Sequence, residues 1–220
     1  MKPVGSRAKA VLATAIGLAV ALAVAVALAV TVLPDNPVKG FFKQQEALHT
    51  AKMHMSQVKS GKVYTGALRF ADDIDFEHLA LSQVIPTYGI RQNGEVFRYE
   101  NDAYAIYSND KVVALFGIYK DAIYSGTSMS NIGLEVVQGM LEDPGTCVRI
   151  LSYGYSGEIY ATPNSEEVVR LLDPGPSFLD GSPPPLPAPE VMPMESVGVT
   201  PEMISQIDFP EHQNPVPFSV

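Results

Sequence analysis

Residues 125–130 are the stretch whose side chains come closest to a catalytic motif. They read Ser-Gly-Thr-Ser-Met-Ser and precede a predicted helix at 131–143. A serine hydroxyl becomes a nucleophile only when a neighbouring base, usually histidine, removes its proton. The histidines of the chain are His49, His54, His78 and His212. We interpret 125–130 as a small-residue loop that ends in the N-cap of the helix, and the alternative is a hydrolase that uses the Ser128 loop.

The same six residues resemble the nucleophile motif of subtilisin-like proteases. That motif has a proline two residues after its last small residue, where this chain has Ile132. The family also places its histidine in a His-Gly-Thr-His type of motif, and none of the four histidines has that setting. The resemblance therefore carries no catalytic residue across, and we expect no enzymatic activity.

One group of possible metal ligands lies in a predicted helix at 38–59. Its members are His49, Met53, His54 and Met55. His49 and Met53 are one helical turn apart, and both are soft ligands that suit Cu(I). No carboxylate or cysteine completes a ligand set nearby. We therefore interpret the methionines as apolar filling of an amphipathic helix.

A second group of possible metal ligands is mostly acidic. Its members are Asp72, Asp73, Asp75, Glu77 and His78. An EF-hand calcium loop needs glycine at its sixth position and glutamate at its twelfth. Counted from Asp72, those positions hold Glu77 and Gln83. We predict a solvated helix N-terminus leading into a helix at 76–83, and we predict no metal and no cofactor.

Tyrosines are dense on the predicted strands. They are Tyr99, Tyr104, Tyr107, Tyr119, Tyr124, Tyr153, Tyr155 and Tyr160. Tyrosine is enriched in protein-binding surfaces, but it also suits half-buried strand positions. We predict a peptide-binding face that contains Tyr99, Tyr104, Tyr107 and Tyr119, and the alternative is that these rings belong to the core.

Short β-like runs separated by turn residues dominate residues 61–172. The predicted hairpins join 85–90 to 95–99, 103–107 to 111–120, and 148–153 to 158–161. A last helix is predicted from Asn164, with Glu167 completing a capping box. Because hairpins dominate and helices are few, the predicted fold class is α+β, an antiparallel sheet with a few packed helices.

Residues 10–33 contain no charged side chain, no amide side chain and no proline. About 20 apolar residues in a helix span the hydrocarbon core of a bilayer. Basic residues precede the run, which predicts a cytoplasmic N-terminus at 1–9 and a single transmembrane signal anchor at the cell membrane. The alternative is a signal peptide cleaved near the Ala-Leu-Ala site at 27–29, which would release a secreted protein.

Two further segments flank the predicted domain at 61–172. Residues 34–60 are predicted to form a juxtamembrane amphipathic helix. Residues 173–220 hold twelve of the eighteen prolines, and their charged residues are all acidic. Such a composition buries too little apolar surface to offset the entropy of ordering, so we predict a disordered acidic tail.

Composition narrows the possible partners. The 220 residues carry a formal net charge of −9, which argues against a nucleic-acid partner because that would require a basic surface. The chain has one cysteine, Cys147, and therefore no internal disulfide. Cys147 opens an apolar run, so we predict that it is buried.

Four apolar motifs resemble the extracytoplasmic domains of uncharacterised exported proteins of Gram-positive bacteria, some of which sit beside secreted proteases. The motifs lie at 85–88, 104–107, 110–114 and 157–160, and the resemblance covers about residues 62–172. It implies an extracellular accessory domain. We therefore expect a membrane-anchored, non-catalytic domain that binds a peptide, a protein or cell-envelope material, with an exported hydrolase or protease-associated enzyme as the alternative.

Overall fold

The structure is a computed structural model, and it describes residues 37–61, 74–120, 125–130, 133–143, 145–152, 158–171 and 188–220. The chain divides into two compact units, 1–46 and 47–220, and the boundary lies inside helix α2 (Pro37–Lys59). The segments predicted at 1–9 and 10–33 lie outside the described residues. Within the described part, no helix is both long enough and apolar enough to cross a membrane.

Helix α2 confirms the helix predicted at 38–59. Gly61 follows it with a φ of 65°, the left-handed conformation that glycine adopts readily at helix ends. The larger unit consists mainly of one sheet, which holds ten strands among the described residues. Its strands are β1 (Leu79–Leu81), β2 (Ile85–Ile90), β3 (Val96–Ser108), β4 (Lys111–Lys120), β5 (Ser125–Ser130), β6 (Val148–Ser152), β7 (Glu158–Ala161), β8 (Glu167–Leu171), β9 (Glu190–Pro193) and β10 (Val216–Phe218). Its helical elements after α2 are α3 (Leu134–Glu142), η1 (Met194–Val197) and α4 (Pro201–Ile204).

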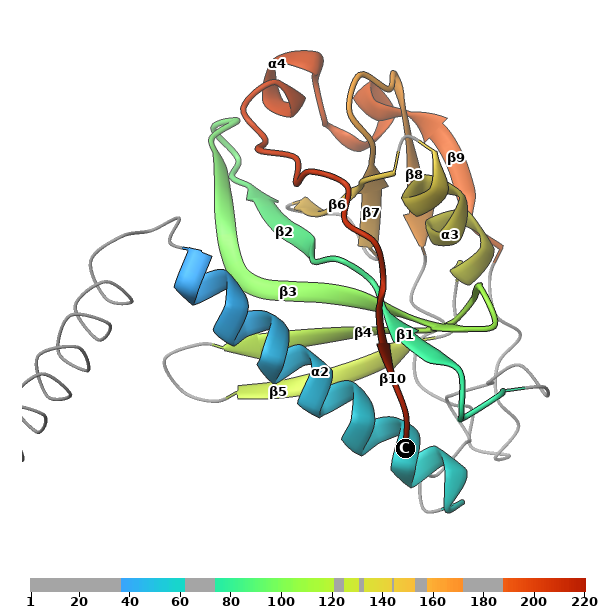
Figure 1. Cartoon of the computed structure of the whole chain (residues 1–220). Helices are drawn as coiled ribbons and strands as arrows, with labels where there is room; N and C mark the ends of the chain where they lie inside the picture. Colours follow the sequence, from blue (N-terminus) through green and yellow to red (C-terminus); the bar gives the residue numbers. More distant parts are fainter. Residues whose placement is uncertain are drawn as a thin grey trace, which may run out of the picture. The chain divides into compact units, whose positions relative to one another are not determined.

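The long bent strand β3 organises the sheet (Figure 1). Its first half pairs with β2, and its second half pairs with β1 on one side and β4 on the other. From β2 the sheet continues through β6, β7 and β8 to β9, while β5 extends it beyond β4 and β10 beyond β1. All pairs are antiparallel except β2 with β6. The predicted α+β class with a mainly antiparallel sheet is therefore confirmed.

Two local turns explain the hairpins around β3. Gly94 has a φ of 82° in the turn between β2 and β3. Asn109 and Asp110 have φ values of 48° and 63° in the two-residue turn between β3 and β4, which is the type I′ geometry that matches strand twist. The hairpins predicted at these places, and the β6–β7 pair, are confirmed. The structure differs in that β3 is one strand where two were predicted.

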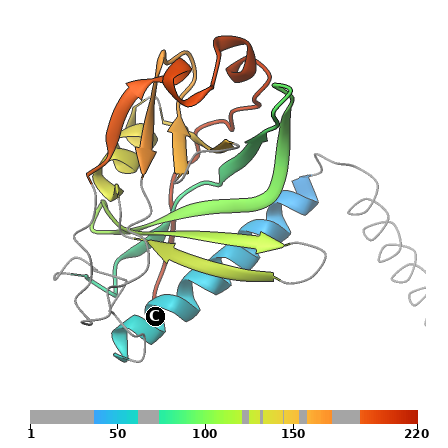
Figure 2. The ribbon, with the colours of Figure 1, turned by 180° about the vertical axis from the view of Figure 1, so that it is seen from behind.

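Alternating side chains of the sheet fill cores on both of its faces. Along β3, Tyr104 and Ile106 pack with α2, whereas Ala103 and Ala105 pack with α3. Both views show the part of α2 after residue 47 crossing one face of β3 and β4, with β5 beside β4 (Figure 2). The helix side of that cluster is formed by Ala47, Ala51 and Met55, which are spaced four residues apart. The predicted juxtamembrane helix is thus partly a core element of the domain.

The prediction of a disordered tail is wrong for residues 188–220. These residues form β9, η1, α4 and β10, and they supply much of a third core cluster on β2, β6, β7 and β8. The buried contributors are Met194, Val197, Val199, Ile204, Ile207 and, in the α2 cluster, Phe218. The prolines stand where proline is tolerated, such as Pro201 in the first turn of α4 behind the N-cap Thr200. Residues 172–187 lie outside the described part of the chain.

The helix predicted from Asn164 is also wrong, because the segment forms strand β8 between β7 and β9. Asn164 has a φ of 60°, and the Ser165 hydroxyl accepts the N–H of Glu167 in a turn. A capping box and a serine turn both use a polar side chain to bind a nearby backbone N–H, so the local signal does not separate them. The β-branched pair that follows favours the strand once neighbours are available.

Two further predictions of local structure are corrected. The helix predicted at 76–83 is a turn followed by β1, whose alternate leucines, Leu79 and Leu81, are buried. The loop predicted at 125–130 is strand β5, which pairs with β4. The N-cap of α3 is Gly133, which makes no side-chain hydrogen bond. In both cases an edge of the sheet supplies hydrogen-bond partners that a segment in isolation lacks.

Two glycines of α3 should respond oppositely to alanine. Gly133 has a φ of 65°, and a Cβ there would lie 2.3 Å from Cδ2 of the buried Leu171. Gly133→Ala should therefore lower the free energy of unfolding by about 2 kcal/mol, through backbone strain and displacement of Leu171. Gly139 lies within the same helix, and a Cβ there meets nothing within 4 Å. Gly139→Ala should raise the free energy of unfolding by about 0.5–1 kcal/mol, as measured by urea titration. Equal effects at the two positions would contradict this account.

Candidate functional site

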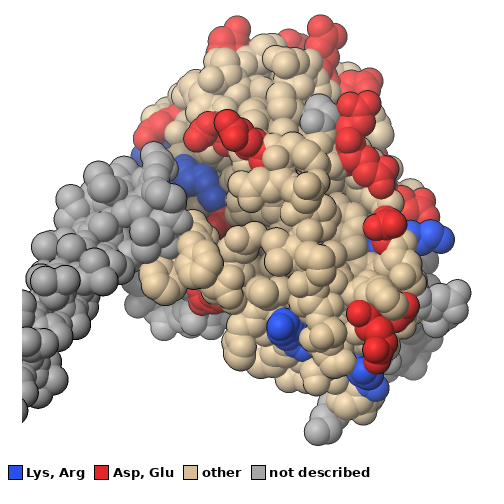
Figure 3. All heavy atoms as spheres, in the orientation of Figure 1, with Lys and Arg blue, Asp and Glu red and all other residues tan. Residues whose placement is uncertain are grey.

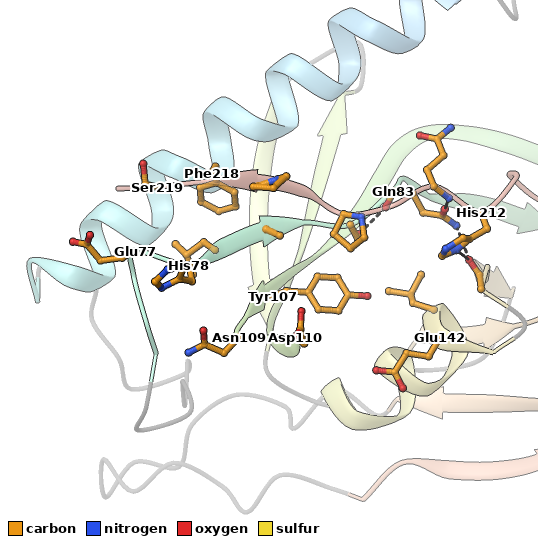
Figure 4. A pocket seen from close by; sticks show the side chains of 18 residues that line it. Glu77, His78, Gln83, Tyr107, Asn109, Asp110, Glu142, His212, Phe218 and Ser219 are labelled. Atoms are coloured by element: carbon orange, nitrogen blue, oxygen red, sulfur yellow. Dashed lines mark hydrogen bonds between the residues drawn. The ribbon is translucent and has the colours of Figure 1, made fainter.

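A cleft of about 760 Å³ lies where four distant segments of the larger unit meet. The segments are 77–83, 107–110, 141–145 and 212–219. Its polar lining includes Glu77, His78, Asn109, Asp110, Glu142 and His212, and its apolar lining includes Leu79, Leu141 and Phe218. Figure 4 shows Tyr107 in the middle of this set, with Asp110 beside it.

A tight turn before β1 positions one end of the cleft. The Asp75 carboxylate lies 2.8 Å from Nδ1 of His78 and accepts the backbone N–H of Glu77 at 2.9 Å. The hydrogen bonds from His78 and then from Glu77 hold the pKa of Asp75 below its usual value. The backbone N–H of Asp75 itself donates to the Ser108 hydroxyl, at the end of β3, at 2.8 Å. The side chains of Glu77 and His78 therefore project from a turn that is fixed at both ends.

Beside the cleft, hydrogen bonds join α3 to the β3–β4 turn and to the start of β4. The side chain of Gln138 accepts the backbone N–H of Val112 and donates both to the backbone oxygen of Asp110 and to the carboxylate of Glu142. Tyr107 lies next to this link, and burial, followed by the nearby Glu142 charge, raises its pKa to about 12. The phenol therefore stays protonated at physiological pH and remains available as a hydrogen-bond donor.

The C-terminal segment forms the far wall. The Gln83 side chain donates to the backbone oxygen of Gly145 at 3.1 Å and accepts the backbone N–H of Gln213. Nδ1 of His212 lies 2.9 Å from the same Gly145 oxygen, which can only accept, so Nδ1 carries the proton. Gly145 has a φ of 87°, and a Cβ there would lie 2.9 Å from Nδ1 of His212. Only glycine combines this backbone conformation with this contact.

The cleft has an acidic electrostatic character. Among its lining residues, Glu77, Asp110 and Glu142 carry carboxylates, and none carries a lysine or arginine side chain. Acidic side chains also predominate over basic ones on the molecular face in Figure 3. An acidic, partly apolar cleft favours a cationic group on an apolar stem, as in lysine or arginine side chains.

No family model, curated protein or solved structure matches this chain.

The structure separates the four tyrosines predicted to form one binding face. Tyr104 is 3% exposed and stacks on Phe116, with ring centroids 5.5 Å apart. Tyr107 packs with the α3 cluster on the opposite face of β3 and lines the cleft. Tyr99 is half-buried against Phe97 near the other end of β3, with centroids 4.8 Å apart. The side chain of Tyr119 lies outside the described part. Of the three tyrosines whose side chains the structure describes, Tyr107 alone lines the cleft.

Ser128 and the possible metal ligands of α2 lie in elements other than the four segments that form the cleft. Ser128 lies in β5 opposite Gly117 of β4. On α2, His49 and Met53 are exposed and His54 is half-buried, whereas Met55 is completely buried in the core, so the four candidate ligands do not face one common point. Within the described residues, no three His, Cys, Asp or Glu side chains are close enough together to hold a metal ion. Asp72 and Asp73 lie outside that part of the chain.

Cys147 is completely buried in the α3 cluster, as predicted. Burial raises the pKa of its thiol to about 12. The thiolate is the reactive form of cysteine, so this group is protonated and shielded at neutral pH. Cys147 therefore has a structural role in the core.

Arg149 is another buried polar residue, and neighbouring side chains accept hydrogen bonds from its guanidinium. Its guanidinium donates to the Thr87 hydroxyl at 3.0 Å and to the Glu158 carboxylate at 2.9 Å. The Tyr160 hydroxyl also donates to Glu158, at 2.8 Å. Because each member has a partner, this network ties β2, β6 and β7 together and presents no open site.

In the sequence, Glu77 and His78 stand out only as members of an acidic cluster, and no pattern marks Asp110, Glu142 or His212 as residues of a site. These three residues come from a hairpin turn, a helix end and the segment interpreted as a disordered tail. No spacing in the sequence joins them. Their proximity follows from the pairing of β1 with β3 and β10.

Proposed function

We propose that this chain is a single-pass membrane protein whose α+β domain lies outside the cell and binds a peptide or protein partner without catalysis. The anchor is the apolar run at 10–33, and release by cleavage near 27–29 is the alternative for localisation. The binding site is the acidic cleft, and the partner is an extended segment that carries lysine or arginine.

The observation that carries this proposal is the combination of carboxylates and apolar side chains in one cleft. Glu77 and Asp110 lie in different parts of the cleft (Figure 4) and form no ion pair within the described residues, so each would attract a separate ammonium or guanidinium group of the ligand. The methylene stem of the ligand would contact Leu79 and Phe218, which line the same cleft. The neutral phenol of Tyr107 supplies a hydrogen-bond donor for a backbone carbonyl of the partner.

The test uses the full-length chain in phosphatidylcholine nanodiscs and a fluorescein-labelled peptide of alternating lysine and alanine. We expect the Glu77→Gln/Asp110→Asn double variant to weaken binding about tenfold, since two partly exposed charge contacts together contribute about 1.4 kcal/mol. Fluorescence anisotropy at low ionic strength measures the change, and binding should fall as salt is added.

The matched control removes the same two charges elsewhere. Glu135 and Glu195 are exposed and do not line the cleft, so Glu135→Gln/Glu195→Gln should bind the peptide like the unmodified chain. A peptide of alternating glutamate and alanine should not bind. Equal losses in the two double variants would mean that overall charge and not the cleft attracts the peptide, and the proposal would then be withdrawn.

A further inference from the structure

The smaller unit presents two adjacent phenylalanines on the first turns of α2. Phe41 is 57% exposed and Phe42 is 54% exposed, and their rings meet edge to face with centroids 6.0 Å apart. Large aromatic side chains are usually mostly buried, and neighbouring residues on a helix point about 100° apart. The pair therefore exposes a broad apolar surface. Among the described residues, Met53 and Val191 are the other large apolar side chains with high exposure.

The sequence around the pair fits the boundary between lipid and water. It reads Lys-Gly-Phe-Phe-Lys at positions 39–43, so a lysine stands on each side of the pair in the sequence. On helices that lie at a membrane surface, phenylalanine side chains enter the boundary between headgroups and acyl chains, and lysine side chains of the same helix extend toward the phosphates. A protein-binding patch would not require this bracketing by basic residues.

The short chain between the apolar run and the phenylalanine pair also keeps the pair close to the membrane. The apolar run ends at Leu33, α2 begins at Pro37, and Phe41 follows four residues later. Four extended residues reach about 14 Å, and four helical residues add about 6 Å. Phe41 can therefore lie no more than about 20 Å from the end of the run, which brings it within reach of the headgroup region.

We infer that Phe41 and Phe42 insert into the boundary between headgroups and acyl chains, so that the first turns of α2 rest on the bilayer. The occupant of this apolar surface is lipid. The inference depends on the proposed membrane anchor, because the anchor holds the pair beside the bilayer. It adds a second contact that would orient the start of α2 relative to the membrane.

The absence of tryptophan from the chain allows a direct test. Phe42→Trp places a single fluorophore in the patch, Val26→Trp places one in the apolar run, and Val191→Trp places one on the exposed strand β9. Each full-length variant is reconstituted into phosphatidylcholine–phosphatidylglycerol vesicles with bromine on the acyl chains, near either the glycerol end or the methyl end.

We expect the emission of Phe42→Trp to fall about twofold with bromine near the glycerol end, since a ring buried ~5–10 Å below the surface touches those carbons. Bromine near the methyl end should quench it less. Val26→Trp should show the reverse preference, and Val191→Trp should not be quenched. Phe41→Trp serves as the second variant in case one substitution disturbs the helix.

The three tryptophan positions test the lipid contact of the phenylalanine pair separately from the membrane anchor. If Val26→Trp is quenched while neither Phe variant is, the anchor stands and the lipid contact is refuted. If Val26→Trp is not quenched, the proposed anchor fails, and quenching of the Phe42 variant would still support a lipid contact. A blue-shifted but unquenched Phe42→Trp would mean that protein, such as a second copy of the chain, covers the patch, and it would overturn the inference.

Discussion

Val197→Asp is expected to unfold the larger unit at neutral pH. Val197 is 1% exposed and packs in the cluster that the C-terminal region forms with β2, β6, β7 and β8. The substitution removes an apolar contact and buries a carboxylate without a partner, which together cost more than about 4 kcal/mol. That loss is comparable to the whole free energy of unfolding of many domains.

The single cysteine provides the measurement. Burial raises the pKa of the Cys147 thiol to about 12, so a maleimide should label it slowly in the folded chain and rapidly once the core opens. We expect rapid labelling of Val197→Asp and slow labelling of the unmodified chain. This readout works on the full-length protein in detergent or in a membrane.

Val191→Asp is the matched control, because it makes the same change in the same segment at a position that is 62% exposed. It should leave the protection of Cys147 unchanged. If Val197→Asp were protected equally well, residues 188–220 would not form part of the core, and the original prediction of a disordered tail would be restored.

Tyr104→Ala is expected to lower the free energy of unfolding by about 3–5 kcal/mol. The ring is 3% exposed and stacks on Phe116 between β3 and α2, so its removal leaves a large cavity in the core. Urea titration followed by circular dichroism measures the shift. This result would assign Tyr104 to packing and not to a peptide-binding face.

Tyr99→Ala tests the same residue type on the same strand in a more open place. Tyr99 is half-buried beside Phe97, and we expect a loss of about 1 kcal/mol. The outcome that would reverse the assignment is a Tyr104→Ala variant that unfolds like the unmodified chain but no longer captures a partner. In that case the tyrosines would form the recognition surface despite their burial.

Local sequence patterns predicted the structure correctly where a segment makes its hydrogen bonds within itself, as a helix or a tight hairpin does. Asn109 and Asp110 adopt the left-handed backbone that a two-residue hairpin requires, so the β3–β4 hairpin follows from residue types alone. Helix α2 follows in the same way from its composition and from the glycine at 61. The burial of Cys147 follows from the apolar run that it opens.

Local sequence patterns did not predict the structure of segments whose pairing and packing partners lie far along the chain. The residues of β8 carry both a helix-capping pattern and β-branched side chains, and pairing with β7 and β9 decides for the strand. The proline content of residues 188–220 indicated disorder. Composition averages over a segment, however, and does not reveal that its few apolar residues each meet a buried surface on the sheet.

The sequence by itself determined the α+β class, three strand pairings, the helices α2 and α3 and the acidic charge of the protein. It also contains the apolar run from which we propose a membrane anchor. Tertiary structure alone decided the cleft, because the C-terminal strand β10 returns to pair with β1 and brings His212 and Phe218 to Glu77 and Asp110. The physical reason is that strand pairing is satisfied between distant segments, so no local pattern records which side chains it brings together.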